Sequence, residues 1–340
     1  MSRNVGRDRY SQMRAVICNA YGPPDKLVIG ELPSPEPGCD EVRIEVWSAG
    51  VNFPDTLIIE GKYQQKPAMP FAPGFEVAGM IAELGSDVRG LQVGDRVMSL
   101  TSSGYGAFAE EAVARAAEVV PIPDGLNYAA ATALYTAYGT AYHGLVQRGG
   151  LKAGETLVVL GASGGVGLAS VELGKALGAT VIAVGRTEER LIAARDKGAD
   201  YLVSYNGDLK ARILELTDGK GADVCIDMLG GSPFAALSRA MNWGGRLLIV
   251  GFTSGEIPQL AVNLPLLKGY SVIGVYWGQF VARDPVGNIA NFKALGKMIG
   301  SGKISPHIAG VFNLEETTTA LNTFLSRRVT GKLVINVRSQ

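Results

Sequence analysis

Cysteine and histidine are scarce in this chain of 340 residues, which contains three Cys and two His. Cys18, Cys39 and Cys225 lie far apart in the sequence, so they form neither the disulfide framework of a small secreted protein nor a four-thiolate zinc site. We interpret them as small apolar residues rather than as reactive thiols. His143 has no metal-ligating residue near it in the sequence, and we expect it to be structural.

An excess of charge of either sign is also missing. The 32 Lys and Arg residues balance the 32 Asp and Glu residues, which argues against nucleic acid or an anionic membrane as the main partner. No run of about 18 apolar residues is free of charges and of Gly or Pro, so we expect no membrane-spanning helix. Residues 1–12 lack the apolar run of a secretory signal. We therefore expect a cytoplasmic protein, with residues 1–12 as a flexible leader.

Glycine, in contrast, is abundant. The 45 glycines are roughly twice the usual share of about 7%, which indicates many tight turns and close backbone approaches. The length and the 47% hydrophobic content allow about two domains with large cores.

The pattern of apolar residues changes near residue 130. Before it, short β-rich runs separated by Pro and Gly predict a barrel-like β domain, with strands at 41–47, 76–84 and 95–100. After it, strands alternate with helices, and we expect strands at 156–160, 180–184, 201–204, 223–228, 246–251 and 271–276. This alternation predicts a doubly wound parallel sheet with right-handed crossovers. We expect residues 1–130 and 286–340 to form one domain, the latter as a return segment, and residues 131–285 to form the inserted one.

The strongest local motif is the turn Gly161–Gly167 (GASGGVG), which follows a predicted strand and begins a predicted helix. Its spacing is that of G-x-G-x-x-G with Ala162 at the first position. Glycines let the backbone approach a diphosphate, and the helix start supplies open N–H groups. The motif therefore predicts a dinucleotide site that includes Ser163, Gly164, Gly165 and Val166; a purely structural turn is the alternative.

The end of the second predicted strand bears on the choice of coenzyme. NAD sites usually place Asp or Glu there to accept from the ribose 2′-hydroxyl. Here Arg186 stands at the strand end and Arg190 follows one turn later, and a guanidinium pairs well with a 2′-phosphate. We predict NADP(H) over NAD(H). In the alternative interpretation the arginines form a solvated helix face, neutralised by Glu188 and Glu189. Tyr205 either stacks near the adenosine or caps a loop.

Several motifs together resemble the zeta-crystallin-like quinone oxidoreductase branch of the medium-chain dehydrogenase/reductases. They are Ala49–Asp55 (AGVNFPD), Gly61–Tyr63 (GKY), Pro73–Gly79 (PGFEVAG), Val93–Val97 (VGDRV), Thr140–Tyr142 (TAY) and the glycine turn. Their order and spacing match the family from about Met13 to Val337. The resemblance implies an α/β protein with a GroES-like β-rich catalytic domain and a Rossmann domain. It also implies NADPH as coenzyme and a homodimer.

The same stretches bear on zinc. Zinc-dependent relatives carry Cys in the first of these stretches and His just before the Glu of the Gly-x-Glu segment. Here Asn52 lies in the first stretch and Phe75 precedes Glu76. A catalytic zinc needs three protein ligands, so we expect no metal site.

The resemblance also implies roles for individual residues. It places Asn52, Tyr63 and Thr140 at the nicotinamide end, with Tyr63 donating a hydrogen bond or proton and Asn52 binding a developing oxyanion. The alternatives are a loop-capping amide for Asn52, a surface aromatic for Tyr63 and a plain helix residue for Thr140. Further coenzyme contacts are implied for Gly251, Phe252, Thr253, Val275, Tyr276, Trp277 and Lys332; core packing is the alternative for Trp277, and a solvated side chain for Lys332.

Without a metal, the substrate must already accept hydride readily. A quinone or an activated alkene qualifies, because the negative charge develops on a conjugated oxygen. We therefore expect an NADPH-dependent quinone oxidoreductase acting on a small molecule. A reductase of enones or 2-substituted acrylates, and a coenzyme-binding protein without turnover, are the alternatives.

Overall fold

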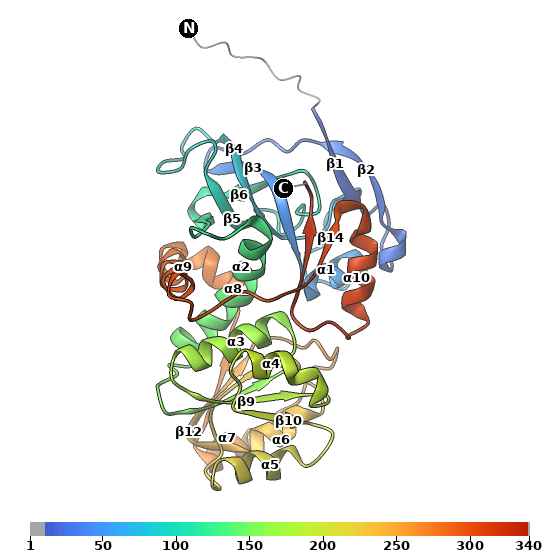
Figure 1. Cartoon of the computed structure of the whole chain (residues 1–340). Coiled ribbons are helices and arrows are strands. Elements are labelled where there is room, and N and C mark those ends of the chain that lie inside the picture. Colours follow the sequence, from blue (N-terminus) through green and yellow to red (C-terminus); the bar gives the residue numbers. More distant parts are fainter. Residues whose placement is uncertain (1–10, 339–340) are drawn as a thin grey trace. The chain divides into compact units, whose positions relative to one another are not determined.

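The computed structural model describes residues 11–338, which form two compact units (Figure 1). The main stretch of the first unit ends at Tyr135, and Gly310–Arg328 and the chain from Leu333 belong to it as well. The second unit comprises Thr136–Ala309 and Val329–Lys332. Of the predicted leader, residues 1–10 lie outside the described residues, and Gln12 already begins a strand.

The return to the first unit comes later than the expected residue 286. Helix α9 (Pro285–Gly300) belongs to the second unit, where it packs against α8 (Trp277–Arg283). The rings of Trp277 and Phe292 meet edge to face, with centroids 6.5 Å apart. The apolar face of α9 is thus buried before the chain reaches Gly310.

The first unit is built from antiparallel sheet. Strands β1 (Gln12–Ile17) and β2 (Val28–Pro33) pair with each other. The larger sheet has the order β14 (Ile308–Asn313), β15 (Lys332–Asn336), β3 (Glu41–Val51), β4 (Glu76–Leu84), β5 (Arg96–Leu100) and β7 (Val120–Pro121), and β6 (Glu111–Arg115) pairs with β3. The strands predicted at 41–47, 76–84 and 95–100 are therefore present, and the chain beyond Gly310 adds strands to the same sheet. Its helical elements are η1 (Pro24–Lys26), α1 (Phe53–Ile59), η2 (Ala116–Glu118), η5 (Leu314–Glu316) and α10 (Thr317–Leu325).

The second unit contains a six-stranded parallel sheet. Its order is β10 (Tyr201–Ser204), β9 (Thr180–Gly185), β8 (Thr156–Leu160), β11 (Ala222–Asp227), β12 (Met241–Ile249) and β13 (Ser271–Gly274). In sequence order this is 3-2-1-4-5-6, the arrangement of a doubly wound dinucleotide-binding sheet. The chain reverses its direction of growth between β8 and β11, so the crevice outside the carboxyl ends of these strands is the expected ligand position.

Both faces of the parallel sheet are covered, which explains its continuous apolar strands. On one face, α5 (Leu209–Leu216) and α6 (Pro233–Arg239) form a core with the strands that includes Val158, Ile182, Ile213, Cys225, Phe234 and Leu237. The other face packs against α3 (Gly165–Ala176) so closely that a Cβ on Gly174 would lie 2.5 Å from Cδ2 of Leu157. Each fully buried large apolar side chain contributes about 1.5–3 kcal/mol.

The helices not yet described complete this unit. Helix α2 (Tyr128–Tyr142) begins in the first unit, ends in the second and continues as a π-helix, η3 (His143–Arg148). After β9 come η4 (Glu189–Leu191) and α4 (Ile192–Asp196), and α7 (Asn263–Lys268) precedes β13. Burial raises the pKa of the Cys225 thiol well above its usual value, as expected for an apolar core residue, whereas Cys39 is exposed.

Candidate functional site

The glycine turn is shaped by backbone packing. Gly161 directly follows β8 and has a φ of +83°, which favours glycine. Its N–H and that of Ala162 both donate to the carbonyl of Val184 in β9, at 3.0 and 3.2 Å. A Cβ on Gly167 would lie 2.2 Å from the carbonyl oxygen of Gly161. The helix can therefore approach the strand only because this position lacks a side chain.

Helix α3 begins at the end of this turn with open donors. Gly164 is its N-cap in extended conformation, and the N–H of Leu168 donates to the carbonyl of Gly164 at 2.8 Å. The N–H groups of Gly165, Val166 and Gly167 precede that first helical bond, as at every helix start. Together with the helix dipole they form a binding position for an anion. The backbone cradle therefore fits the diphosphate of a dinucleotide coenzyme.

Lys332 lies beside the same turn. The N–H of Gly331 donates to the carbonyl of Ser163 at 2.9 Å, and Gly331 forms a parallel bridge with Gly164. Cδ of Lys332 lies 3.7 Å from the position that a Cβ on Gly165 would occupy, and the side chain is buried. We name Val329–Lys332 the strap. It brings a lysine next to the predicted diphosphate position, more than 150 residues away in the sequence.

The end of β9 carries the predicted coenzyme-selecting arginines. Arg186 is exposed directly after the strand, and Arg190 is half-buried in η4. The backbone N–H of Glu189 and the hydroxyl of Thr187 lower the pKa of the Glu189 carboxyl, so this carboxylate is held within its own loop. The N–H of Tyr205 donates to the carbonyl of Gly185 at 2.9 Å, which fixes the predicted adenosine neighbour to the same strand end.

The loops after β11 and β12 are joined at the same edge of the sheet. The N–H and hydroxyl of Thr253 both donate to the carbonyl of Met228, at 3.1 and 3.0 Å. Asp227, fully buried, accepts from the N–H groups of Leu229 and Gly230, each at 2.8 Å. Burial raises the pKa of the Asp227 carboxyl. The predicted coenzyme contacts Gly251, Phe252 and Thr253 are half-buried here, and Asp227 fixes the facing loop.

The residues after β13 differ in their exposure to solvent. Tyr276 is exposed and Val275 is buried. Trp277 is buried as well: a Cβ on Gly139 would meet its ring at 2.6 Å, and its Nε1 donates to Oδ1 of Asn288 at 3.3 Å. This environment corresponds to the core-packing alternative for Trp277.

Helix α2 places Thr140 in the second unit, where it is buried. One turn later, Nδ1 of His143 lies 2.6 Å from Oε1 of Gln147, which also accepts from Nδ2 of Asn291 at 3.0 Å. The His143 ring stacks on Phe280 at 4.1 Å. Burial lowers the pKa of His143, in agreement with its expected structural role.

Asn52 and Tyr63 belong to the first unit. Nδ2 of Asn52 donates to Oε2 of Glu76 at 2.9 Å and to the carbonyl of Gly50 at 3.2 Å, and the residue caps α1. Both amide hydrogens are thereby directed to protein acceptors, which resembles the loop-capping alternative more than an oxyanion donor. Glu76 is fully buried, and no local sequence signal marks it as the partner of Asn52. Tyr63 is half-buried in a loop after α1.

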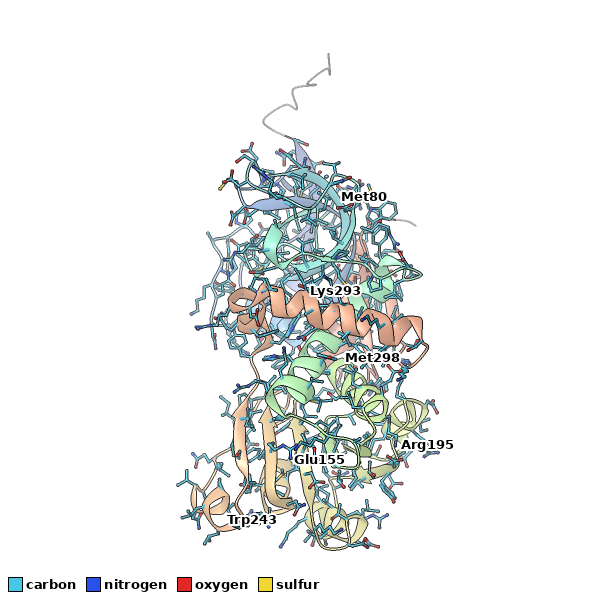
Figure 2. All side chains as sticks on the ribbon, turned by 90° about the vertical axis from the view of Figure 1, so that its left-hand side faces the viewer. Met80, Glu155, Arg195, Trp243, Lys293 and Met298 are labelled. Atoms are coloured by element: carbon cyan, nitrogen blue, oxygen red, sulfur yellow. The ribbon has the colours of Figure 1, made fainter. Side chains whose placement is uncertain are left out.

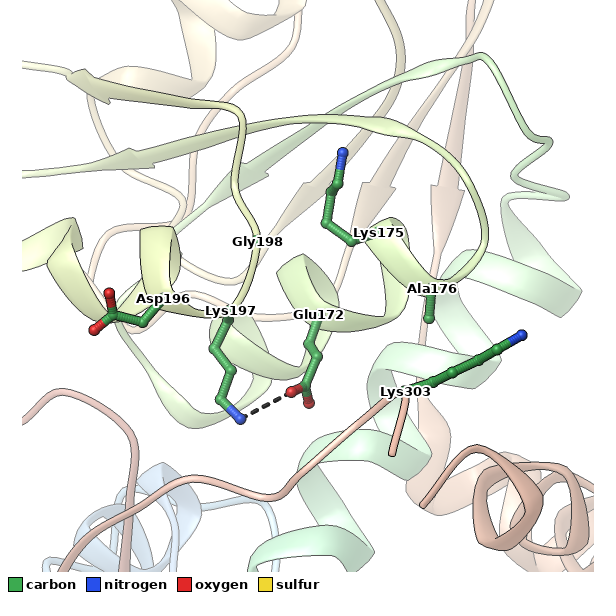
Figure 3. Close-up of a pocket in the computed structure, with 7 residues that line it drawn as sticks. All are labelled: Glu172, Lys175, Ala176, Asp196, Lys197, Gly198 and Lys303. Carbon is green, nitrogen blue, oxygen red and sulfur yellow. Dashed lines mark hydrogen bonds and ion pairs between the residues drawn. The ribbon is translucent and has the colours of Figure 1, made fainter. Parts of the chain in front are cut away.

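A groove of about 470 Å³ lies on the second unit (Figure 3). It is lined by Glu172, Lys175, Ala176, Asp196, Lys197, Gly198 and Lys303. Its lining carries three lysines and two carboxylates, and none of the predicted site residues lines it. Within residues 11–338, no group of three or more His, Cys, Asp and Glu side chains is arranged to hold a metal ion. None of the described helices has the length and apolar character needed to cross a membrane.

Comparison with known proteins decides the family. Residues 38–124 match the model of the alcohol dehydrogenase GroES-like domain, and residues 165–293 match the zinc-binding dehydrogenase model. The quinone oxidoreductase-like protein 2 homolog of Nematostella vectensis is 40% identical over 343 residues, covering 98% of this chain and 91% of the relative. This chain belongs to the zeta-crystallin-like quinone oxidoreductase branch of the medium-chain dehydrogenase/reductase superfamily. The resemblance read from the sequence motifs is thereby confirmed.

Solved structures of this superfamily agree over nearly the whole chain. A quinone oxidoreductase of Pseudomonas syringae pv. Tomato has a TM-score of 0.88 and 28% identity, covering 95% of this chain and 99% of that one. A mycobacterial protein solved in complex with NADPH has a TM-score of 0.89 and 29% identity, covering 95% and 100%. The chain is thus a medium-chain oxidoreductase with a nicotinamide-coenzyme fold, as the α/β prediction of a GroES-like and a Rossmann domain required.

Proposed function

We propose that this oxidoreductase transfers hydride from NADPH to a quinone without a metal ion. The observation that carries the proposal is the combination at one sheet edge of the glycine turn, the open start of α3 and an arginine in place of a carboxylate after β9. The relatives named quinone oxidoreductase support the acceptor class.

The protein's own groups bind and orient in this proposal. The coenzyme supplies the hydride when it is bound. The N–H groups of Gly165, Val166 and Gly167 and the ammonium of Lys332 hold its diphosphate, and the guanidinium of Arg186 holds its 2′-phosphate. Positions 52 and 75 carry Asn and Phe, so soft zinc ligands are missing where zinc-dependent relatives have them.

At the substrate end of the site, Tyr63 is the proposed proton donor. We propose that its phenol donates to the oxygen of the substrate on which negative charge develops. Asn52 serves by holding the start of α1 and Glu76 in place, since both hydrogens of its amide are already donated. An enone or acrylate oxygen would meet the same phenol, and a reductase of activated alkenes therefore remains the second candidate.

Acceptor-dependent oxidation of NADPH tests the proposal. Purified protein with NADPH is given a benzoquinone, a naphthoquinone, cyclohexenone or a 2-substituted acrylate, and the loss of NADPH absorbance is followed. We expect turnover with quinones that is unchanged by a chelator. For Tyr63→Phe we expect the rate of turnover to fall by at least about tenfold. Turnover with alkenes alone would replace the quinone by the second candidate. Tight NADPH binding without any turnover would indicate a non-catalytic binding protein.

We also propose that the protein is a cytoplasmic homodimer formed by the outer edge of the second unit. Among the described strands, β13 pairs with β12 alone and ends the sheet. In β12 and in the chain that leads from it to β13, five large apolar side chains are at least 70% exposed: Trp243 (labelled in Figure 2), Ile257, Val262, Leu266 and Leu267. An exposed strand edge is a template for pairing, and antiparallel pairing with a second copy about a twofold axis would remove both edges from water. We name these five residues and β13 the edge patch.

A further inference from the structure

The carbonyl oxygen of Arg186 is held by two side chains from the end of the neighbouring strand. Oγ of Ser204 donates to it at 2.7 Å and Nδ2 of Asn206 donates to it at 2.9 Å. The N–H of Asn206 in turn donates to Oγ of Ser204 at 3.2 Å. Ser204 lies beside Gly185 in the parallel register of β9 and β10. We name Ser204 and Asn206 the carbonyl clamp.

We propose that the carbonyl clamp determines the preference for a 2′-phosphorylated coenzyme by positioning Arg186. This inference rests on the proposed NADPH site and adds two residues to it. Ser204 and Asn206 are positioning residues, because they act through the backbone of Arg186 rather than on the coenzyme.

The clamp acts first on geometry. Fixing the carbonyl of Arg186 fixes the peptide plane that follows it and limits the direction of the Cα–Cβ bond. On the same side of β9, the N–H of Tyr205 donates to the carbonyl of Gly185, and on the other side the N–H of Gly161, after β8, donates to the carbonyl of Val184. A guanidinium that is attached to a fixed backbone loses less conformational entropy when it binds a phosphate.

The clamp also acts on charge. A carbonyl oxygen at a strand end is a partial negative charge and a hydrogen-bond acceptor. If it were open, it would repel a 2′-phosphate and could accept from the 2′-hydroxyl of NADH, which is the task of the carboxylate in NAD sites. Two donors, the hydroxyl of Ser204 at the end of β10 and the amide of Asn206 just after it, already bind this oxygen. The clamp therefore favours NADPH, because the Arg186 carbonyl oxygen is no longer open to accept from the 2′-hydroxyl of NADH.

Equilibrium binding to the intact protein tests this inference without turnover. The Kd values of NADPH, NADH, 2′,5′-ADP and 5′-AMP are measured by calorimetry for the wild type, Asn206→Ala, Ser204→Ala and Ser204→Thr. We expect either alanine variant to weaken NADPH and 2′,5′-ADP about three- to tenfold, as the loss of one hydrogen bond implies. NADH and 5′-AMP should change less than about twofold or bind slightly more tightly. Ser204→Thr keeps a hydroxyl and should therefore retain most of the preference for NADPH over NADH.

Asn242→Ala is the matched control. Nδ2 of Asn242 donates to Oδ1 of Asp223 at 2.7 Å, at the start of β12 and therefore at the opposite, amino edge of the sheet. This variant removes a comparable hydrogen bond from a side-chain amide, and it should leave the ratio of the NADPH and NADH Kd values unchanged. Melting temperatures of all variants report whether the unit stays folded.

The outcomes separate this inference from the proposed function. Equal weakening of NADPH and NADH by the alanine variants, or no change in either, would overturn the role of the clamp while NADPH binding stands. A wild type that binds both coenzymes equally would overturn it too, together with the role of Arg186. A wild type that binds neither would overturn the proposed function itself.

Discussion

Gly167 illustrates at the scale of one residue how a missing side chain decides a site. Its Cβ would lie 2.2 Å from the carbonyl oxygen of Gly161 and 2.8 Å from Cα of Ala162, and both of these are backbone atoms that cannot rotate away. We predict that Gly167→Ala displaces the turn from α3, destabilises the protein by about 1–3 kcal/mol and weakens NADPH binding at least about tenfold. Urea unfolding and calorimetric titration measure the two effects.

Gly300→Ala provides the comparison for this prediction. Gly300 is the last residue of α9, and a Cβ there would meet nothing within 4 Å. That variant should be neutral or slightly stabilising, because Ala is the better helix former. If Gly167→Ala bound NADPH as tightly as Gly300→Ala does, the close approach of strand and helix would not be needed for coenzyme binding.

At this scale the sequence predicts residue types that act by themselves and misses those that act through a neighbour. The proposed role of Arg186 has a sequence signal, because an arginine replaces the carboxylate that NAD sites place after the second strand. Ser204 and Asn206 carry no such signal, since polar residues in turns are common and the carbonyl they bind is 18 and 20 residues away. Glu76 is missed for the same reason: its partner Asn52 lies 24 residues earlier.

At the scale of elements, a buried polar cluster ties α2, α3 and the chain after α9 together. Glu172 of α3 accepts from Nζ of Lys197 at 2.8 Å (Figure 3). It also accepts from the N–H of Ser305 at 3.0 Å and from the hydroxyl of Tyr138. Burial and the neighbouring Glu172 carboxylate raise the pKa of the Tyr138 phenol. We predict that Glu172→Ala costs about 3 kcal/mol of unfolding free energy, because it leaves a largely buried ammonium without its counter-charge.

A surface ion pair separates this effect from charge removal in general. Arg212 and Glu215 pair at 2.7 Å with side chains that are 47% and 68% exposed. Glu215→Ala should therefore change the unfolding free energy by less than about 0.5 kcal/mol in the same urea titration. Similar losses for Glu172→Ala and Glu215→Ala would show that the cluster is not a structural anchor.

The periodicity of apolar residues predicts most of the elements. The expected strands at 156–160, 76–84 and 201–204 have the observed bounds, because each is a short apolar run bordered by turn residues. Strand β12 starts at Met241, five residues before the expected start at Arg246. Its first half contains Gly244 and Gly245, which are unfavourable in strands. Met241 nevertheless pairs with Ala222 of β11, and after a register shift the pairing resumes at Arg246.

At the scale of the whole molecule, the edge patch predicts the oligomeric state. A stable interface buries about 800 Å² per partner with an apolar centre, and the exposed side chains of the patch are of the type such a centre contains. We predict that the protein sediments as a dimer and that Leu266→Glu combined with Leu267→Glu shifts it to the monomer. Analytical ultracentrifugation over a range of concentrations measures this directly.

Val286→Glu is a suitable control for the dimer prediction. Val286 is 77% exposed at the start of α9 and is not part of the edge patch. It should leave the dimer intact. A wild type that stays monomeric at concentrations well above those used for catalysis would show that the patch has no second copy as its partner.

The division into two units follows from the change in sequence rhythm near residue 130, but its later boundary does not. Both the observed return at Gly310 and the expected one at residue 286 are compatible with the local pattern. The difference lies in contacts distant in sequence, such as that of Asn291 with Gln147. Such long-range pairings are what a single sequence does not reveal.

The strap has a consequence for dissecting the protein. Only four residues, Val329–Lys332, cross into the coenzyme unit from a chain that otherwise belongs to the first. A fragment cut at Ala309 would keep every strand of the parallel sheet and the whole Gly161–Gly167 loop, yet it would lose Gly331 and Lys332. Such a fragment would therefore lack the lysine of the proposed diphosphate site, although it keeps the glycine loop.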